Sequence, residues 1–251
     1  MNDIANPQVP IIEQTLQRLA TQFTVRDIMV PTEKLVKAQT TEEALCRLKE
    51  YEDYNLIPLE KENRIIGYVE RGDTKKQVID LASAVGIGSS ILDLVDVLAD
   101  RQFSFVLGVR GIEGYVHFSD LNHHLVNLPF YILLQAVEAH VISLIQGRVN
   151  EANLHEVFDK INPKIVQNIM SNYNKNKAND ANRSLLNEVN LDKMLTFACH
   201  FDLLELKKEE IVELYKVRNS VAHVTEMLIQ KHDDVERLVR TKDQCQKILS
   251  S

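Results

Sequence analysis

Three side chains that could act on a phosphate group lie close together near the end of the chain: Arg218, Asn219 and His223. A guanidinium can neutralise charge on a phosphoryl transition state, an imidazole with a pKa near neutrality can transfer a proton, and an amide can orient either group. Residues 209–239 have apolar side chains at helical spacing, so the three polar groups are expected on one long helix. This combination predicts a site for a phosphate or a phosphodiester.

Arg218 is expected within the apolar stripe of this helix, where its charge needs a partner. The stripe is predicted to consist of Ile211, Leu214, Val221, Ala222 and Leu228. One interpretation is structural, because the arginine can extend to solvent or form an ion pair with a buried carboxylate such as Glu138. The other interpretation is that the arginine, the amide and the imidazole bind a phosphate together. The residues alone leave both interpretations open.

An Arg-Asn pair followed after three residues by His, late in a helical segment, resembles the signature of the HEPN superfamily, whose active members are metal-independent endoribonucleases. The resemblance implies that Arg218, Asn219 and His223 are catalytic. It also implies that Glu138 meets the arginine across a helical bundle and that no metal is required. Because Arg218 and His223 are five residues apart, they diverge by roughly 140° on a regular helix. A homodimer in which two copies share one cleft is therefore expected.

The first half of the chain contains an internal repeat. Gly67–Asp73, Gly-Tyr-Val-Glu-Arg-Gly-Asp, returns 47 positions later as Gly114–Asp120, Gly-Tyr-Val-His-Phe-Ser-Asp. Each copy follows an apolar run and, before that run, a segment with helical spacing at 41–51 or 90–101. Each copy is therefore predicted to form a helix, a strand, a tight turn and a second strand, with an Asp opening a further helix.

The repeated unit resembles a tandem CBS-domain pair over residues 24–125. Three stretches of the first copy carry the resemblance: the opening Val25–Met29, the helix start Thr40–Ala44 and the strand Asn55–Leu59. The second copy lacks the proline of that strand and has a degenerate opening. The resemblance implies a regulatory module with a ligand site between its two repeats.

In CBS pairs the Asp after the glycine-containing strand typically contacts the ribose of an adenine nucleotide, which implies Asp73 and Asp120 as ligand-binding residues. The Ser or Thr that helps to hold phosphate in the family is replaced here by Glu70 and His117. A carboxylate at position 70 opposes an anionic ligand, whereas His117 can serve as a cation or a stacking partner. The alternative is that both aspartates only cap helices by accepting backbone N–H groups.

The second half of the chain is predicted to be helical throughout. Helices are expected at 130–146, 155–171, 185–201 and 209–239, with a last turn at 242–249. Residues 172–183 are polar without an apolar period and are expected to form a loop. Four or five helices around one core follow from this pattern.

The composition is that of a soluble globular protein, with 45% hydrophobic and 26% charged residues. No apolar run is expected to reach the length of a bilayer, and the N-terminus lacks a signal-type pattern. A cytoplasmic location without membrane contact is therefore expected. Cys46, Cys199 and Cys245 are scattered and lack the spacing of a metal or redox site.

The charge distribution limits how the chain could bind nucleic acid. Residues 1–120 hold 13 Lys+Arg and 19 Asp+Glu, a balance of −6, and residues 121–251 hold 16 and 17, a balance of −1. Neither half has the positive excess on which non-specific nucleic-acid binding depends. An RNA site must therefore rest on a local patch or on a surface shared by two chains.

The predicted fold class is α+β, with an α/β tandem CBS pair and an N-terminal helix at 1–125 and an all-α HEPN-like bundle at 126–251. The predicted function is metal-independent cleavage of RNA, regulated by an adenine nucleotide or cyclic dinucleotide, as in a toxin or a stress or phage-defence effector. An RNA substrate and a second copy of the chain are the expected partners, and no cofactor is expected to be required for catalysis. The alternative is a non-catalytic protein that senses a nucleotide and dimerises.

Overall fold

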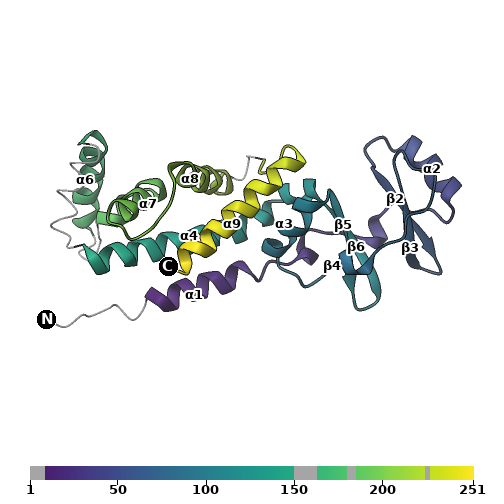
Figure 1. Ribbon diagram of the computed structural model, residues 1–251, viewed down its shortest axis with the longest axis horizontal. Helices are drawn as coiled ribbons and strands as arrows, with labels where there is room; N and C mark the ends of the chain where they lie inside the picture. Colours follow the sequence, from purple (N-terminus) through teal and green to yellow (C-terminus); the bar gives the residue numbers. More distant parts are fainter. Residues whose placement is uncertain (1–8, 150–162, 180–184, 224–226) are drawn as a thin grey trace. The chain divides into compact units, whose positions relative to one another are not determined.

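A computed structural model describes residues 9–149, 163–179, 185–223 and 227–251 (Figure 1). The chain divides into two compact units. The helical unit consists of Met1–Ala20, Phe130–Glu226 and Arg240–Ser251, and the repeat unit consists of Thr21–Pro129 and Met227–Val239. The sequence predicted two parts divided at residue 125. In the structure α1, at residues 9–20, groups instead with the helical unit, and residues 227–239 group with the repeats.

The repeat unit contains two copies of one helix–hairpin arrangement, each preceded by a short strand that lies at a different place in the repeat. The first copy consists of β1 (Val30–Pro31), α2 (Thr41–Glu50), β2 (Leu56–Lys61) and β3 (Arg64–Glu70). The second copy consists of β4 (Val85–Gly86), α3 (Ile91–Asp100), β5 (Phe103–Gly108) and β6 (Gly111–His117). Short 3-10 helices lie at η1 (Val25–Asp27), η2 (Thr32–Lys34), η3 (Leu81–Ser83) and η4 (Phe118–Asn122).

The strand register confirms the repeat residue by residue. In the first hairpin Ile57 pairs with Val69, and 47 positions later Ser104 pairs with Val116. Every other pair of the two hairpins obeys the same offset, and so does the β-bulge, which follows Leu59 in one copy and Val106 in the other.

The opening segment of each copy pairs with the hairpin of the other copy. Val30 of the first copy pairs with Tyr115 of the second, and Gln77, 47 positions after Val30, pairs with Tyr68 of the first. This exchange relates the copies by a pseudo-two-fold axis. The four-stranded sheet, in the order β1-β6-β5-β4, is mixed because β4 pairs parallel with β5, whereas the two-stranded sheet β2-β3 is antiparallel.

The helices of the repeat unit begin where side-chain caps are available. Thr40 accepts a hydrogen bond from the Glu43 amide and Ser90 accepts one from the Asp93 amide, so each helix starts with a satisfied donor. The apolar face of α2 then packs on its own hairpin in a core of buried residues: Ala38, Ala44, Leu48, Ile57, Leu59 and Val69.

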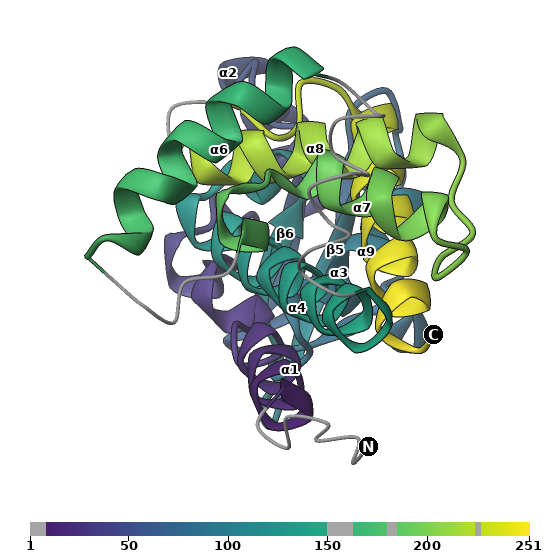
Figure 2. The same ribbon diagram turned by 90° about the vertical axis from the view of Figure 1, so that its left-hand side faces the viewer.

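The helical unit is built around α4 (His124–Arg148). Figure 2 looks along this helix and shows the other helices of the unit around it. They are α1 (Val9–Ala20), α6 (Pro163–Lys177), α7 (Leu191–His200), α8 (Lys208–Ala222) and α9 (Val235–Leu249), with a 3-10 turn, η5, at Leu185–Glu188. An all-helical second half is therefore confirmed for the described residues.

Two predictions in the second half were wrong in their limits, and a third lies partly outside the described residues. The single helix expected at 209–239 is two helices, because α8 ends at Ala222 and α9 begins only at Val235. The predicted loop at 172–183 is helical as far as Lys177. Of the helix expected at 155–171, residues 155–162 lie outside the described part of the chain.

Helix α4 also contradicts the expectation that no segment reaches the length of a bilayer. By length and composition it could cross a membrane, and half of its most apolar window is buried inside the protein. Its buried residues recur at helical spacing: Phe130, Leu133, Leu134, Val137, Val141 and Ile145. A core helix has this pattern, because it buries the apolar face that a membrane helix exposes to lipid.

Candidate functional site

A cavity of about 220 Å³ in the repeat unit is lined by residues of both copies, and we call it the Asp120 cavity. The second copy contributes Tyr115, His117, Ser119 and Asp120 from the end of β6 and from η4. The first copy contributes two segments, the strap Lys34–Val36 and the loop Asp53–Asn55, together with Leu56 and Pro58 of β2. The cavity therefore exists only because the two copies face each other.

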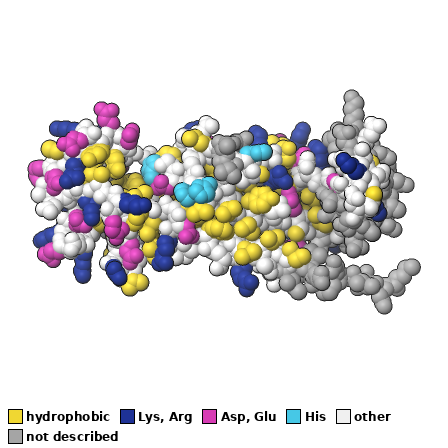
Figure 3. Space-filling view, turned by 180° about the vertical axis from the view of Figure 1, so that it is seen from behind, with side chains coloured by type: hydrophobic (Ala, Val, Ile, Leu, Met, Phe, Trp, Pro, Cys, Tyr) yellow, Lys and Arg dark blue, Asp and Glu magenta, His cyan; other side chains and the backbone are white. Residues whose placement is uncertain are grey.

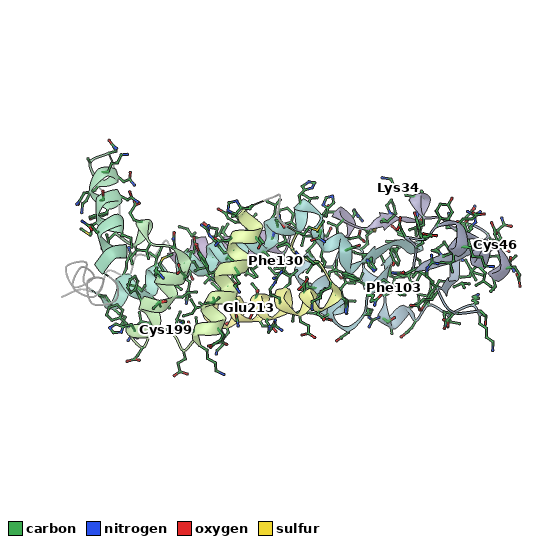
Figure 4. All side chains as sticks on the ribbon, turned by 90° about the horizontal axis from the view of Figure 1, so that it is seen from above. Lys34, Cys46, Phe103, Phe130, Cys199 and Glu213 are labelled. Atoms are coloured by element: carbon green, nitrogen blue, oxygen red, sulfur yellow. The ribbon has the colours of Figure 1, made fainter. Side chains whose placement is uncertain are left out.

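A second cavity, of about 520 Å³, lies at the position related by the pseudo-two-fold axis, and we call it the Glu70 cavity. Its lining residues include Tyr68, Glu70, Asp100, Arg101, Phe103 and Phe105, all 47 positions from lining residues of the Asp120 cavity. Lys34 and Phe103, which line the two cavities, are labelled in Figure 4. The repeat has thus produced a pair of equivalent cavities with different side chains.

The differences favour the Asp120 cavity for a polar or anionic ligand. Glu70 stands where the other cavity has His117, and two further carboxylates, Asp80 and Asp100, line the same space. The cation of that cavity, Arg101, donates to the Ser83 carbonyl at 2.8 Å. An anion would therefore meet three carboxylates in the Glu70 cavity, whereas the Asp120 cavity has two carboxylates, Asp53 and Asp120, together with Lys34 and His117.

Asp120 is held in place by its own short helix. Its Oδ2 accepts the backbone amide of His117 at 2.8 Å, and His117 Nδ1 lies 2.8 Å from the Ser119 hydroxyl. The Ser119 amide donates to the same ring nitrogen at 3.3 Å, which places the proton of a neutral ring on Nε2. These bonds fix the carboxylate and the imidazole side by side at the end of β6.

Burial governs protonation in the Asp120 cavity. It lowers the pKa of His117, against the raising effect of Asp120, so the imidazole favours its neutral form. Burial raises the pKa of Asp120, against the lowering effect of the His117 amide, and it also raises the pKa of Tyr115. The cavity therefore offers a partly buried carboxyl acceptor and a protonated phenol donor.

Asp73 lies elsewhere, although its place in the repeat matches that of Asp120. It is not among the residues that line the Glu70 cavity, and its Oδ2 accepts a hydrogen bond from Gln77 Nε2 at 2.8 Å. No helix begins at Asp73, and the next one, η3, has Asp80 as its N-cap, so the expectation that Asp73 opens a helix was wrong. Asp120 lies inside η4, whose N-cap is His117 rather than the aspartate.

In the helical unit the structure brings Arg218 and Glu138 together. Arg218 Nε lies 3.6 Å from Glu138 Oε1, with 35% and 17% of the two side chains exposed, and Gln135 donates to the other oxygen of Glu138 at 2.7 Å. The predicted partner is therefore confirmed. The arginine is half-buried rather than central in the stripe, whose described members on α8 are Ile211, Leu214, Val217 and Val221.

His223 and Asn219 lie at the C-terminal end of α8. His223 is the residue that ends the helix, its side chain is exposed, and its amide donates to the Asn219 carbonyl at 3.1 Å. Ala222, which was expected in the apolar stripe, is exposed as well. Arg218, Asn219 and His223 thus share the last turns of one helix, with Asn219 half-buried beside the ion pair.

The loop 51–55 was missed in the sequence. Its lining residues carry no motif of their own, and only the offset of 47 relates them to lining residues of the other cavity. A comparison of the two copies position by position would have drawn attention to this loop. Lys34 was missed too, and its counterpart, Leu81, does not line the Glu70 cavity.

No protein-family model matches the chain, and no curated protein matches it. Among solved structures, the chain is similar to the CBS domain of the bacterial CNNM/CorC family Mg²⁺ transporter in complex with ATP, with 19% identity, 48% of this chain and 98% of that chain covered, and a TM-score of 0.35. A second structure of that CBS domain has 18% identity, covers 48% of this chain and 85% of its own, and has a TM-score of 0.36. These matches report similarity alone. The repeat and its two cavities are supported by the strand register of this chain itself.

Proposed function

We propose that this chain is a ligand-sensing regulatory protein and that the Asp120 cavity binds a nucleoside-type ligand, with an adenine nucleotide as the first to test. The observation that carries the proposal is the placement of Asp120 in a cavity formed by both copies, with Oδ2 fixed by the His117 amide. The proposal agrees with the CBS resemblance of the same residues.

The lining chemistry supports a ligand with hydroxyl groups and an anionic end. The Asp120 carboxylate can accept from a ribose hydroxyl, the Tyr115 phenol can donate, and Lys34 can attract a phosphate. Leu56 and Pro58 supply apolar surface for a flat base. A volume of about 220 Å³ matches one nucleoside-sized group rather than a dinucleotide.

Isothermal titration of the full chain with adenosine, its mono-, di- and triphosphates and cyclic dinucleotides tests this proposal. At least one adenine compound should bind, and at a hundredfold excess over its Kd it should stabilise the protein by about 2.7 kcal/mol. Asp120→Asn should abolish binding, because the amide cannot accept two donors with both of its polar atoms. Asp73→Asn is the matched control and should bind as the wild type does.

A second function, metal-independent cleavage of RNA, is favoured by one observation in the helical unit. Arg218, Asn219 and His223 occupy consecutive turns at the end of α8, and the side chain of Arg218 remains 35% exposed despite its ion pair with Glu138. An exposed imidazole and a partly exposed arginine side chain at the end of the same helix can supply proton transfer and charge neutralisation. The HEPN resemblance assigns Arg218, Asn219, His223 and Glu138 to this reaction.

The charge of the protein weighs against RNA binding by one copy. The whole chain has a net charge of −7, and Figure 3 shows Lys and Arg side chains interspersed with Asp and Glu on the face that it presents. A cleft shared by two copies would double the number of Arg218 and His223 side chains available to one phosphate. RNA cleavage is therefore proposed for a homodimer.

The test is cleavage of single-stranded RNA by the purified protein in EDTA, with analysis of the product ends. The proposal expects a 2′,3′-cyclic phosphate and a loss of roughly 100- to 10,000-fold in rate for His223→Ala. His200→Ala is the matched control, since His200 is an exposed histidine at the end of α7 in the same unit. Equal rates for the wild type and His223→Ala, with and without adenine nucleotide, would leave only the sensing function.

A further inference from the structure

The loop 51–55 between α2 and β2 is longer than its counterpart in the second copy. It comprises five residues, whereas only Arg101 and Gln102 separate α3 from β5. Asp53, Tyr54 and Asn55 of this loop line the Asp120 cavity, so its conformation decides the shape of one wall. A longer loop has more conformations to lose and needs something to hold it.

One side chain, that of Arg71, donates hydrogen bonds to several main-chain carbonyls of this loop. Its Nη2 donates to the carbonyls of Tyr51 at 2.7 Å, Glu52 at 3.2 Å and Tyr54 at 2.8 Å, and its Nε donates to Tyr54 at 3.1 Å. Its backbone amide also donates to the Asn55 carbonyl at 2.7 Å. A planar guanidinium can do this because its donors diverge in a fixed fork.

The clamp exists in the first copy alone. Position 71 corresponds, 47 residues later, to Phe118, whose side chain has no donor. Arg71 follows β3, and its side chain is exposed, so it does not itself belong to the cavity lining. Arg71 therefore acts on the wall of the Asp120 cavity only through its hydrogen bonds to the main chain of loop 51–55.

We propose that Arg71 is a positioning residue that holds loop 51–55 in the conformation that makes the Asp120 cavity ready for its ligand. The proposal rests on the proposed sensing function. Without the clamp, loop 51–55 would sample other conformations, and the apparent Kd would rise by the inverse of the fraction that remains ready to bind. If that fraction falls to a tenth, Kd rises about tenfold. The change should appear in the association rate, because the bound state is unaltered once the loop has closed.

Hydrogen–deuterium exchange of the unliganded full chain tests the clamp without any ligand. Arg71→Ala should speed exchange of the Tyr54 amide, which donates to the Tyr51 carbonyl in the ordered loop. Arg71→Lys should give an intermediate result, since an ammonium cannot reproduce the fork. Arg101→Ala, which removes another arginine bound to a main-chain carbonyl, should leave loop 51–55 unchanged.

Stopped-flow binding of the adenine nucleotide then tests the effect on the cavity. Arg71→Ala should lower the association rate about tenfold with little change in dissociation, and millimolar guanidinium ion should restore part of the rate by occupying the vacated position. If Arg71 had a purely structural role, Arg71→Ala would lower stability, but it would not slow association selectively and guanidinium ion would not restore the rate. Unchanged exchange in loop 51–55 would overturn the proposal, and so would wild-type association by a variant with a loosened loop. Failure of the wild type to bind any nucleotide would instead contradict the proposed function, and exchange would still decide whether the clamp exists.

Discussion

Burial shifts the pKa values of His117 and Asp120 in opposite directions, because loss of a proton neutralises the imidazole but charges the carboxyl group. The ordinary pKa of histidine is 6.5, and burial lowers that of His117, so the folded protein binds a proton here less readily than the unfolded chain. Asp120 and His232 also act on the ring, the first raising and the second lowering its pKa. The buried Asp120 carboxyl instead binds its proton more readily in the folded protein.

Linkage converts the shift of His117 into a dependence of stability on pH. Where the unfolded state binds more protons, the free energy of unfolding falls as pH falls. The contribution of His117 should therefore be complete above about pH 6.5 and decline as pH drops through the lowered pKa. Urea unfolding followed by circular dichroism at pH 7.5 and 5.5 should show a smaller loss for His117→Asn than for the wild type. Equal losses would contradict the prediction.

Asp120→Asn should have the reverse effect on the unliganded protein. The raised pKa means that the charged carboxylate is unfavourable in the fold at neutral pH, while an amide oxygen can still accept the His117 N–H. The midpoint of urea unfolding should therefore rise in the variant that loses ligand binding. A lower midpoint would indicate that Asp120 contributes to stability rather than to a site.

At the scale of elements, the glycine shared by both copies marks where the exchanged segments cross. A Cβ at Gly67 would lie 2.6 Å from the Gln77 carbonyl oxygen, and one at Gly114 would lie 2.6 Å from Met29 Sδ and 3.0 Å from the Val30 carbonyl oxygen. In both copies the close neighbour belongs to the segment that arrives from the other copy. Glycine is therefore required at these positions because the segment from the other copy leaves no room for a side chain, and not because of the conformation of its own strand.

Gly67→Ala should weaken the pairing of residues 76–77 with the first hairpin. The added methyl group would clash with the Gln77 carbonyl oxygen, and a main-chain atom cannot move away as a flexible side chain can. We expect a loss of about 1–3 kcal/mol in the free energy of unfolding, measured by urea titration. Gly88→Ala is the control, since a Cβ there meets nothing within 4 Å. A loss equal to that of the control would show that residues 76–77 can shift at little expense.

The same elements show what the sequence could and could not predict. The two hairpins were predictable because the repeated Gly-Tyr-Val fixes both the offset and the alternation of buried residues. The pairing of each opening segment with the hairpin of the other copy was not predictable, since no local pattern indicates that Val30 pairs with Tyr115 rather than with a strand of its own copy. The end of α8 was missed because the apolar spacing continues past Ala222, whereas the pairing of Arg218 with Glu138 followed from the need of a half-buried charge for a partner.

At the scale of the whole molecule, the repeat unit is discontinuous in sequence. Its last segment, residues 227–239, follows most of the helical unit along the chain. The side chain of Asn122 donates to the Ile229 carbonyl at 2.7 Å and accepts the Ile229 amide at 2.9 Å, and His232 Nε2 lies 2.7 Å from the Leu98 carbonyl oxygen. Leu228 and Ile229 are buried. Residues 227–239 are therefore a structural part of the repeat unit.

Asn122→Ala should weaken this attachment, because it leaves a partly buried amide and carbonyl of Ile229 without their partner. We expect a loss of roughly 1–3 kcal/mol in the free energy of unfolding of the repeat unit. Hydrogen exchange at the Ile229 amide provides the local measurement. Unchanged protection of that amide would show that apolar burial alone holds the segment.

Homodimer formation is the prediction that concerns the whole surface. On α1, Ile12 and Leu19 expose 50% and 44% of their surface, and hydrophobic side chains are also gathered in part of the face that Figure 3 presents. Ile12→Glu together with Leu19→Glu should convert a dimer to a monomer in sedimentation equilibrium if α1 contributes to the contact. A wild-type monomer at micromolar concentration would remove the dimer and the shared RNA cleft with it.

The return of residues 227–239 also bears on how the protein is made. Residues 21–129 leave the ribosome well before the segment that completes their unit, and about 100 residues must be added in between. At about 5–20 residues per second, the interval is roughly 5–20 s. During that time the Asn122 amide and the surface that later buries Leu228 are open to solvent. The nascent repeat unit is therefore expected to be a client for a chaperone, and the ligand proposed for the Asp120 cavity would be able to reach it before synthesis of residues 130–251 ends.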